Sequence, residues 1–549
     1  MNILLLNLRY LAPALERLGH RTAVMAWEER TDPDEWNLRA LVKRAGFEPD
    51  LIVAMLMGYA PLPAGMADSP WPLAAVTLDA PINMFWLRHW LKLFDWVFVD
   101  QRDPARELAA DGIPAQWLPL AVEPWIAQAE PARRKEHDIT FVGCVDKERL
   151  KRKWLLRRLA KSRSLHVAGG QGEDRVSVPA MIDLFGRSRV VLNENFFPGV
   201  TLRVLQGMAA GALVLTEDLG GGLTDLFADG EHLAAFTPET LEGQVSRCLD
   251  DTAFRDGVAR QARAEVLARH LTDHRAEALA DHVELAPPGR APRAARLAHA
   301  ARACLNVSLR YPLHPDMLHA ACEEHANAVL SQGGPDPDLG LALETLGRLR
   351  LAQNRLSEAQ PLLVRAAQFL PQDPAPLFVL GRMAAMQGDE GKARRFMLAG
   401  LARCPLADGA DLARALLKAG DLGPNLSRAL ARVARARGRS WEHGFAKPRD
   451  EECPDTAHEW LALAVRQHGG GPALLDLGRC ALEAGLPDQA AILLAQAAES
   501  LPHDPEPALM AASAAHAAYN SALAELMRSR ARACMTSRSA RPLGKAAGA

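Results

Sequence analysis

TLRVLQGMAAGALVLTED, residues 201–218, carries the pattern that decides the fold: a short helix followed at once by a buried strand. The helix has two long polar side chains, Arg203 and Gln206, on one face, because residues three apart are neighbours on a helix. Gly207 and the alanines after it leave the rest of the helix almost without side chains. Small residues permit close approach, either of a sheet beneath the helix or of a ligand. Packing explains the small residues, whereas the two polar side chains favour a ligand site.

The composition is that of an ordinary globular protein with several domains. The chain has 549 residues, so two to four domains are expected, and 49% hydrophobic with 24% charged residues is typical of globular chains. The formal net charge of -2 gives no bulk attraction to nucleic acid or to an anionic membrane. The eight cysteines form no CxxC pair, which argues against a zinc site or disulfide framework and favours a reducing compartment. No signal peptide and no membrane span of roughly 20 apolar residues is recognisable, so we expect a cytoplasmic protein.

Residues 1–285 alternate short apolar runs with longer amphipathic segments, the pattern of parallel strands covered by helices on both faces. One series of candidate strands comprises ILLLN (3–7), TAVMAW (22–27), DLIVAML (50–56), AAVTLD (74–79) and DWVFVD (95–100). A second series comprises DITFVG (138–143), SLHVAGG (164–170), RVVLNEN (189–195), ALVLTED (212–218) and LAAF (233–236). We therefore predict two doubly wound, Rossmann-like α/β domains, residues 1–125 and 126–285, facing each other across a cleft. Ligands of such sheets bind at the carboxyl ends of the strands.

The composition changes at LAPPGRAPRAAR (285–296), where Pro, Gly and Arg replace the regular pattern, and we expect a linker over 286–298. Residues 299–535 are helical and alanine-rich. The final residues, 536–549, are expected to form a disordered tail.

A repeat is present in the helical region. Leu346-Gly347 recurs 34 residues later as Leu380-Gly381, and Leu477-Gly478 begins a third copy with the same internal spacing of alanine and proline. The Leu-Gly pair lets two helices approach closely, the alanines fill the crossing and the proline ends the second helix. The pattern resembles the tetratricopeptide repeat. The third copy is out of phase with the first two, so the segment at about 406–470 is degenerate or interrupted.

Three strand ends of the second α/β domain converge on one edge of its sheet. After the first strand, Gly143 permits a tight turn into a helix whose unpaired N–H groups and dipole favour an anion. Lys147 and Arg149 lie where they add positive charge against a diphosphate, the alternative being a solvated helix face. For the lysines and arginines after residue 150 we favour the solvated face.

The second strand ends in Asn193, Glu194 and Asn195, before a Pro-Gly loop. Polar residues at such a place are turn formers or ligand contacts. The position favours a ligand contact for Asn193 and leaves the other two open. Thr201 is a candidate N-cap of the helix that follows. The third strand end precedes three glycines, 220–222, which by themselves are a weak indication of a phosphate site and are typical of a flexible loop.

Together these stretches resemble a GT-B glycosyltransferase, and most closely the CgeB-like (spore maturation) family. The matching stretches, in the family's order, are LDAP (78–81), LPLAVEP (118–124), DITFVG…R (138–149), VVLNEN (190–195), LRVLQGMAAGALVLTED (202–218), LFADGEHLAAF (226–236) and HLTDHR (270–275). Each stretch is short, and their joint order carries the resemblance. They cover most of residues 70–280, and residues 1–70 match only as a first domain of the right type.

The resemblance implies a bacterial hexosyltransferase that moves a sugar from a UDP- or GDP-sugar to an acceptor. The donor would lie on the second domain, with the basic residues and Arg203 near the diphosphate and Gln206 at the ribose hydroxyls. Family members usually carry Glu at the position of Gln206, and a glutamine still offers one acceptor and two donors. The expected donor-binding residues are therefore Gly143, Lys147, Arg149, Asn193, Arg203 and Gln206.

Asp79, at the end of a first-domain strand, is the candidate catalytic residue, the alternative being an Asp-Ala-Pro turn. His270 and Arg275 match the family's motif and are expected to close the fold, and the tryptophans at 86, 90 and 96 are expected in the core. No metal-ligand spacing stands out, and GT-B enzymes generally need no metal, so we expect no cofactor other than the nucleotide sugar as co-substrate.

Helical repeats build surfaces that suit peptides, so the expected acceptor is a protein or cell-surface component recruited by the repeats. The alternative function is a catalytically degenerate scaffold in which the repeats bind proteins. Gln206 supports this alternative, as does Pro198, which stands where related retaining enzymes carry an acid. A sugar-nucleotide epimerase of the same fold is a weaker third hypothesis.

Overall fold

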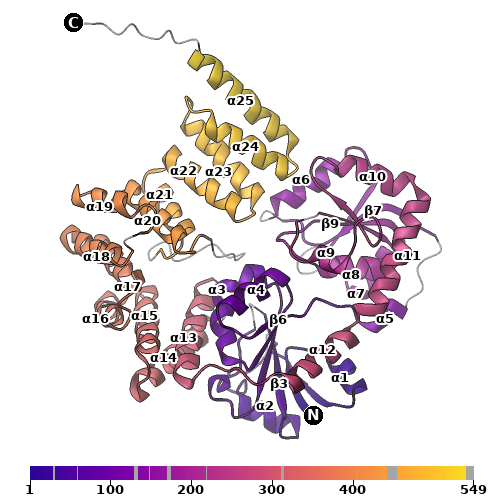
Figure 1. Ribbon diagram of the computed structural model, residues 1–549, viewed down its shortest axis with the longest axis horizontal. Helices are drawn as coiled ribbons and strands as arrows, with labels where there is room; N and C mark the ends of the chain where they lie inside the picture. Colours follow the sequence, from indigo (N-terminus) through magenta and orange to yellow (C-terminus); the bar gives the residue numbers. More distant parts are fainter. Residues whose placement is uncertain are drawn as a thin grey trace. The chain divides into compact units, whose positions relative to one another are not determined.

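The computed structural model describes residues 1–28, 31–57, 60–128, 134–146, 149–169, 175–217, 219–310, 314–404, 406–441 and 454–539. The chain divides into two compact units. Figure 1 labels helices and strands of the chain, coloured along the sequence. The first contains residues 1–144 and 163–371, and the second contains residues 145–162, 372–441 and the described chain from 454 onward. Both sheets belong to the first unit, and the regular structure described in the second is helical.

The first sheet has six parallel strands within the described residues, in the order β2-β1-β3-β4-β5-β6. They are β1 (Asn2–Leu6), β2 (Arg21–Met25), β3 (Leu51–Leu56), β4 (Leu73–Thr77), β5 (Trp96–Val99) and β6 (Ala115–Trp117). The central strands β3, β4 and β5 are buried throughout because helices cover both faces. All strands predicted for this domain are present. The short β6 has no counterpart in the prediction, because Ala-Gln-Trp is not an apolar run.

The second sheet has five parallel strands where the chain is described, in the order β11-β10-β9-β7-β8. They are β7 (His137–Val142), β8 (Leu165–Ala168), β9 (Ser188–Asn193), β10 (Leu213–Glu217) and β11 (Ala234–Phe236), each of them predicted. The prediction of two parallel α/β sheets is thus confirmed. The strand order runs outward in both directions from the β7–β9 pair, so this pair is the topological switch point of the sheet.

Helices and short 3-10 turns connect the strands. In the first domain they are α1 (Ala12–Arg17), α2 (Leu38–Ala45), η1 (Met66–Asp68), α3 (Ala80–Trp90), η2 (Leu91–Leu93) and α4 (Arg102–Ala110). In the second they are α5 (Pro124–Gln128), α7 (Val178–Gly186), α8 (Leu202–Ala209), α9 (Leu223–Leu226), α10 (Leu241–Asp250) and α11 (Thr252–Arg269).

The small residues of α8 serve its packing on the second sheet. A methyl group on Gly207 would lie 2.9 Å from Val214 Cγ2 and 3.2 Å from Val191 Cγ1. Both valines belong to strands of that sheet, β10 and β9. Glycine at 207 is therefore what allows the helix to lie so close to the strands, as packing alone predicts.

The chain crosses between the two α/β domains twice, and the two crossings are bonded to each other. The Val122 N–H donates to the His270 carbonyl at 3.0 Å, and the Thr272 N–H donates to the Val122 carbonyl at 2.9 Å. Arg275 adds a hydrogen bond from Nε to the Pro119 carbonyl at 2.6 Å. Burial, followed by the nearby charge of Arg275, lowers the pKa of His270 to about 4. His270 and Arg275 thus close the fold, with α12 (Thr272–Leu285) returning to pack on α1.

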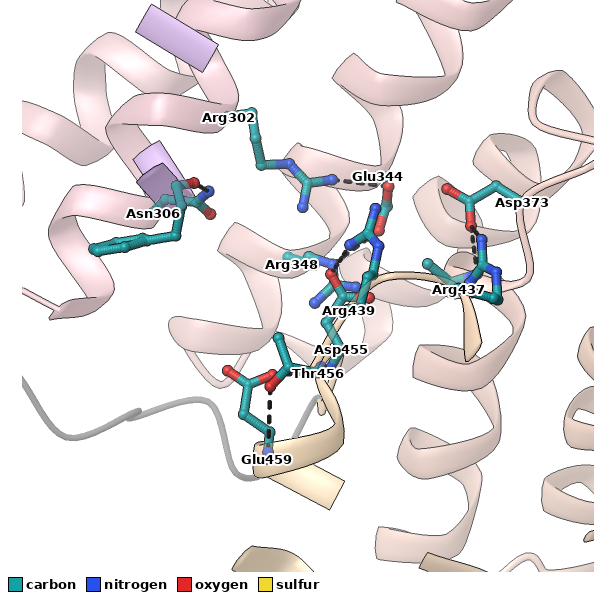
Figure 2. Close-up of polar contacts among 12 residues, drawn as sticks. Arg302, Asn306, Glu344, Arg348, Asp373, Arg437, Arg439, Asp455, Thr456 and Glu459 are labelled. Carbon is teal, nitrogen blue, oxygen red and sulfur yellow. Dashed lines mark hydrogen bonds and ion pairs between the residues drawn. The ribbon is translucent and has the colours of Figure 1, made fainter. Parts of the chain in front are cut away.

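The first unit continues with α13 (Arg293–Arg310), α14 (Pro315–Gln332), α15 (Asp336–Ala352) and α16 (Leu356–Phe369). A buried cluster joins α13 to α15, in which the Glu344 carboxylate accepts from Arg302 at 2.8 Å and from Arg348 at 2.9 Å (Figure 2). None of the three side chains is more than 9% exposed. Removing Glu344 would leave two buried guanidinium groups without this carboxylate, which is strongly destabilising. The predicted core tryptophans at 86, 90 and 96 are all buried.

The second unit contains α6 (Leu150–Leu159), α17 (Ala375–Met386), α18 (Glu390–Ala402), α19 (Ala410–Lys418), α20 (Pro424–Ala436), α21 (Ala457–His468), α22 (Gly471–Glu483), α23 (Pro487–Ser500), α24 (Glu506–Ala517) and α25 (Ser521–Ser539). Figure 2 shows Arg437 paired with Asp373 at 3.2 Å and the capping box in which Thr456 and Glu459 start α21.

The basic helix α6 is less solvated than its composition indicates. Lys151 is 8% and Arg152 is 7% exposed. The helix packs on α23, and the Lys151 N–H donates to Asp488 Oδ2 at 3.1 Å. A solvated face was therefore the wrong interpretation for these two residues, because the sequence pattern does not reveal a partner helix more than 300 residues away.

The Leu-Gly pairs of the repeat lie at helix crossings. A methyl group on Gly347 of α15 would lie 2.6 Å from Leu363 of α16. The corresponding distance is 2.6 Å from Gly381 of α17 to Met397 of α18, and 2.6 Å from Gly478 of α22 to Leu494 of α23. The same close approach thus recurs in three pairs of neighbouring helices, α15–α16, α17–α18 and α22–α23, which is the packing that the repeat predicts.

The helix bounds can be compared with the expected linker and tail. α13 begins at Arg293, inside the segment expected as a linker, and α25 extends to Ser539, past the expected start of the tail. Residues 540–549 of that tail lie outside the described residues, as does Pro405 of the repeat. No helix in the described part of the chain is both long enough and apolar enough to cross a membrane.

Candidate functional site

The candidate site lies at the carboxyl edge of the second sheet, at the switch point between β7 and β9. Val142 ends β7 and Gly143 follows it, while Asn193 ends β9. The next strands of the chain lie on opposite sides of this pair, and ligands of doubly wound sheets bind at such a switch point. The sequence-predicted residues Gly143, Asn193 and Arg203 meet at this place.

Arg203 is held there by three contacts. Its Nε donates to the Val142 carbonyl at 2.9 Å, its Nη1 donates to Asn193 Oδ1 at 2.6 Å, and its guanidinium lies 4.5 Å from the centre of the Phe141 ring. A methyl group on Gly143 would lie 2.7 Å from Arg203 Nη2. The absence of a side chain at 143 therefore leaves room for the guanidinium beside the end of β7.

Asn193 uses its whole amide within the protein. Its Nδ2 donates to Asn195 Oδ1 at 2.7 Å and to Thr216 Oγ1 at 2.9 Å. Its Oδ1 accepts from Arg203 and, at 3.0 Å, from the Thr201 hydroxyl. Two donated and two accepted hydrogen bonds use the full capacity of an amide. Because this fully buried side chain has none left for a ligand, its role is to hold Arg203 in position.

The same network accounts for two neighbouring residues. Thr201 occupies the N-cap position of α8, as predicted, but its hydroxyl makes no capping hydrogen bond and donates to Asn193 instead. Asn195 is 1% exposed and is tied to the end of β10, since its N–H donates to Glu217 Oε2 at 3.0 Å. The polar stretch at 193–195 thus forms a buried network.

The other predicted donor-binding residues are placed differently. Gln206 lies on α8 one turn beyond Arg203; it is half-buried, and its side chain makes no hydrogen bond with the described residues. Arg149 belongs to the second unit, where its Nη1 pairs with Asp146. Lys147 lies outside the described residues.

Gln101 connects the carboxyl edges of the two sheets. This side chain, 2% exposed, follows β5 and binds the backbone of Val200 twice: Nε2 donates to the carbonyl at 3.0 Å, and Oε1 accepts from the N–H at 2.9 Å. The neighbouring Arg102 pairs with Asp225 at 2.6 Å. Sequence patterns gave no indication of these residues, since a Gln-Arg pair at a helix start has many other uses.

The glycine stretch 220–222, in the loop after β10, packs against the loop after β9. A methyl group on Gly221, whose φ is +68°, would lie 2.4 Å from backbone atoms of both Pro198 and Gly199. Only a residue without a side chain fits so close to another backbone segment, and the left-handed conformation has the same requirement. The loop after β10 is thus seated on the loop after β9.

Asp79, the predicted catalytic residue, follows β4 at the edge of the first sheet and precedes α3. It is exposed and lies in the left-handed region at a φ of 53°, which is uncommon for a residue other than glycine. Its N–H donates to Asp100 Oδ2 at 3.0 Å, and the Ala80 N–H donates to the other oxygen at 3.3 Å. The Asp-Ala-Pro stretch, for which a turn was the alternative interpretation, begins α3, and Asp79 at its N-cap is exposed.

Asp100 is a residue of this edge that the sequence interpretation missed. It is 4% exposed, and Gln101 Nε2 donates to it at 3.2 Å. Burial, followed by the charge of Asp79, raises its pKa to about 7. The signal was available: AAVTLD and DWVFVD both end in aspartate, and the ends of neighbouring parallel strands lie side by side.

No group of His, Cys, Asp or Glu that could hold a metal ion occurs among the described residues. The sequence-predicted groups described above are a fixed guanidinium at 203, a backbone without a side chain at 143, an amide at 206 and, at the edge of the first sheet, the Asp79 carboxylate.

Comparison with known proteins finds a family model described as "Glycosyl transferase-like" over residues 149–281. Solved structures with low similarity include sucrose-phosphate synthase from Thermosynechococcus elongatus, at 13% identity over 52% of this chain and 98% of that one, with a TM-score of 0.40. A glycosyltransferase from Rickettsia africae has 11% identity over 51% and 97%, with a TM-score of 0.37. HepE from Anabaena, in complex with UDP-glucose, has 13% identity over 52% and 99%, with a TM-score of 0.38. No curated protein matches the chain. The segment that contains β9, α8 and β10 is thus similar to glycosyl transferases.

Proposed function

We propose that this protein is a glycosyltransferase that takes a sugar from a UDP- or GDP-sugar bound at the carboxyl edge of the second sheet. One observation carries the proposal. A guanidinium, that of Arg203, is fixed beside Gly143 at the switch point of a sheet whose strands β8 to β11 lie within the stretch, residues 149–281, that matches a glycosyl transferase-like family. Phosphate groups are bound by arginine forks and by backbone that approaches closely.

We propose a role for each residue, and for Lys147 and Arg149 the proposal rests on the sequence resemblance alone. Arg203 neutralises the diphosphate of the donor and stabilises the charge that develops on it when the sugar leaves. Gly143 lets the phosphates approach the chain, and Gln206 hydrogen-bonds the ribose with its unused amide. Lys147 and Arg149 add positive charge in the bound state. Asn193 is a positioning residue that holds Arg203.

Asp79 is proposed as the acceptor-side catalytic residue. Its carboxylate is exposed at the edge of the first sheet, and Asp100 fixes its backbone through the two hydrogen bonds described above. A carboxylate at this place can take the proton of an acceptor hydroxyl. Asp79→Asn should therefore reduce kcat by about a hundredfold or more with little change in donor affinity.

We further propose a protein or cell-surface acceptor recruited by tetratricopeptide-like repeats, a hexose as the sugar, the CgeB-like subfamily and a cytoplasmic location. The resemblance of the sequence supports these finer assignments, together with the recurrent helix crossings at Gly347, Gly381 and Gly478.

A transferase-like scaffold without turnover is the second candidate. It is favoured by the neutral side chain at Gln206, where related enzymes carry a carboxylate. A carboxylate accepts hydrogen bonds from ribose hydroxyls more strongly, by about 1 kcal/mol or more.

Release of UDP and GDP from a panel of nucleotide sugars, with and without acceptor, tests the proposal. We expect turnover with at least one donor, and a loss of about a hundredfold in Arg203→Met. Arg395→Glu, an exposed arginine on α18, is the matched control and should leave turnover unchanged. Absence of turnover with every donor, while the protein still binds partners, would establish the scaffold instead.

A further inference from the structure

The first unit contains an apolar pocket that has no role in the chemistry described so far. Its volume is about 90 Å³. One wall is built by the first α/β domain, from the chain around η1 and the end of α3, and the other by α14 with Cys304 of α13. The pocket thus lies where the first helices after the α/β domains pack on the first of those domains.

The wall from the α/β domain is apolar and fixed. It contains Pro33, Pro61 and Pro63, which have no N–H group to donate. The indole of Trp36 is already bonded, since its Nε1 donates to the Pro61 carbonyl at 2.9 Å. The Ala64 N–H donates to the Trp36 carbonyl at 3.0 Å, which ties the two segments of this wall together. The wall therefore keeps its shape without a ligand and offers a ligand mainly apolar surface.

The sequence of α14 places its lining residues on one stripe of the helix. Their positions, 317, 318, 321, 324 and 325, are spaced by three and four residues, the spacing of one helix face. Ala321 lies in the middle of this stripe, and its single methyl group leaves space in front of it. Glu324 and His325 follow one turn later, so the polar side chains of α14 lie together at one end of the pocket.

The charge at this end is negative. Of the described residues in the lining, Glu324 alone carries a formal charge. It is exposed and forms no ion pair with the part of the chain that the structure describes. A single sign of charge beside apolar walls concentrates ions of the opposite sign. The end of the pocket therefore favours a cation and disfavours an anion.

His325 adds a neutral hydrogen-bonding group beside this charge. It is half-buried and makes no hydrogen bond with other described residues. Burial lowers the pKa of His325, and the nearby charges of Glu324 and Asp68 offset this only in part. The ring is therefore uncharged at neutral pH, and one of its nitrogens can accept a hydrogen bond. A carboxylate and an imidazole acceptor together match an ammonium group, which has three N–H donors.

We infer that this pocket binds a small organic cation, with a primary ammonium group at Glu324 and His325 and an apolar body against Ala321 and the facing wall. An apolar cavity of about 150 Å³ binds benzene, so a pocket of about 90 Å³ has room for one ring or a short alkyl chain at most. The ammonium group then stays at the exposed end, beside the carboxylate. This binding does not depend on sugar transfer.

Isothermal titration calorimetry of the full-length protein with benzylammonium tests the inference. Benzyl alcohol has the same ring without the charge and is the matched probe, and benzoate carries the opposite charge. We expect benzylammonium to bind about fivefold more tightly than benzyl alcohol, a difference of about 1 kcal/mol, which is the upper range for an ion pair with an exposed carboxylate. Benzoate should bind more weakly than either.

Two variants locate the binding. Glu324→Gln should remove the preference for benzylammonium and leave the affinity for benzyl alcohol within about twofold. Ala321→Met places a longer side chain in the pocket and should weaken the binding of both probes by at least about tenfold. Glu277→Gln makes the same change in charge at an exposed position of α12, outside the lining, and should leave both affinities unchanged. Far-ultraviolet circular dichroism of each variant confirms that the helices are intact.

Equal affinities for benzylammonium and benzyl alcohol would overturn the inference, because the pocket would then not select a cation. A preference for benzylammonium that survives in Glu324→Gln would do the same, since another group would then supply the charge. Undiminished binding by Ala321→Met would place the site elsewhere in the chain.

Discussion

The bond between Arg203 and Asn193 gives a quantitative test of how the candidate site is built. Arg203→Met removes two hydrogen bonds donated by a charged group, at 2.9 and 2.6 Å, and the contact with Phe141. Each such bond contributes roughly 1.5–3 kcal/mol, so we expect the free energy of unfolding to fall by about 3–6 kcal/mol. Asn193→Leu removes the shared bond and its other partners. In the double variant the shared bond is lost only once, so a coupling of about 1.5–3 kcal/mol is expected.

Urea unfolding followed by tryptophan fluorescence measures the four corners of this cycle. The signal reports on the first unit, because eight of the eleven tryptophans lie within residues 1–144. Arg203→Met combined with Gly478→Ala, which belongs to the other unit, is the control and should be additive within about 0.5 kcal/mol. A coupling below about 0.5 kcal/mol for the Arg203–Asn193 pair would refute the positioning role. UDP titration adds a second readout, in which Asn193→Leu should weaken binding although its amide has no capacity left for a ligand.

Further predictions concern packing and pH. Gly207→Ala should destabilise the first unit by about 1–3 kcal/mol, because the new methyl group would lie 2.9 Å from Val214. At Gly257 on α11 a new methyl group would meet no atom within 4 Å, so Gly257→Ala should stabilise the first unit by about 0.5–1 kcal/mol. Equal changes in the free energy of unfolding for Gly207→Ala and Gly257→Ala, measured in urea, would contradict both predictions. Gly478→Ala should lower the melting temperature of the second unit by several degrees in calorimetry, and an unshifted transition would exclude the tight crossing. The raised pKa of Asp100, about 7 against 3.8, means that the stability it contributes is complete below about pH 4 and is lost as pH rises through about 7. The free energy of unfolding of the wild type, relative to that of Asp100→Asn, should therefore fall between about pH 4 and about pH 7, whereas a constant difference would show that the carboxyl does not titrate there.

The sheets were predictable because each long strand is a continuous apolar run of β-branched and aliphatic residues, as in LIVAML or RVVLN. Such runs report burial on both faces directly. The short strand β6 was not predictable, because three residues with an exposed glutamine in the middle show no hydrophobic periodicity. The helix crossings at Gly347 and Gly478 were also predictable, since a fixed spacing of small residues recurs only where backbones meet.

The site was predictable only in part. Proximity of Gly143, Asn193 and Arg203 follows from the rule that parallel strands end at one edge. The hydrogen-bond partners of these residues cannot be predicted from the same rule, because they depend on side-chain rotamers. Asn193 was therefore expected to contact a ligand, whereas its amide is fully used within the protein.

The paired crossings between the α/β domains restrict how those domains can move. The two chain segments are hydrogen-bonded to each other, since Val122 pairs with His270 and Thr272, and they form one two-stranded connection between the domains. A single strand would permit twisting in any direction, whereas a bonded pair bends most easily about one line. Any opening of the edge where Gln101 binds Val200 would have to break the ion pair between Arg102 and Asp225 and the two hydrogen bonds to this glutamine. Substitution of that single side chain would change how often the site is open without altering any group proposed to touch the donor.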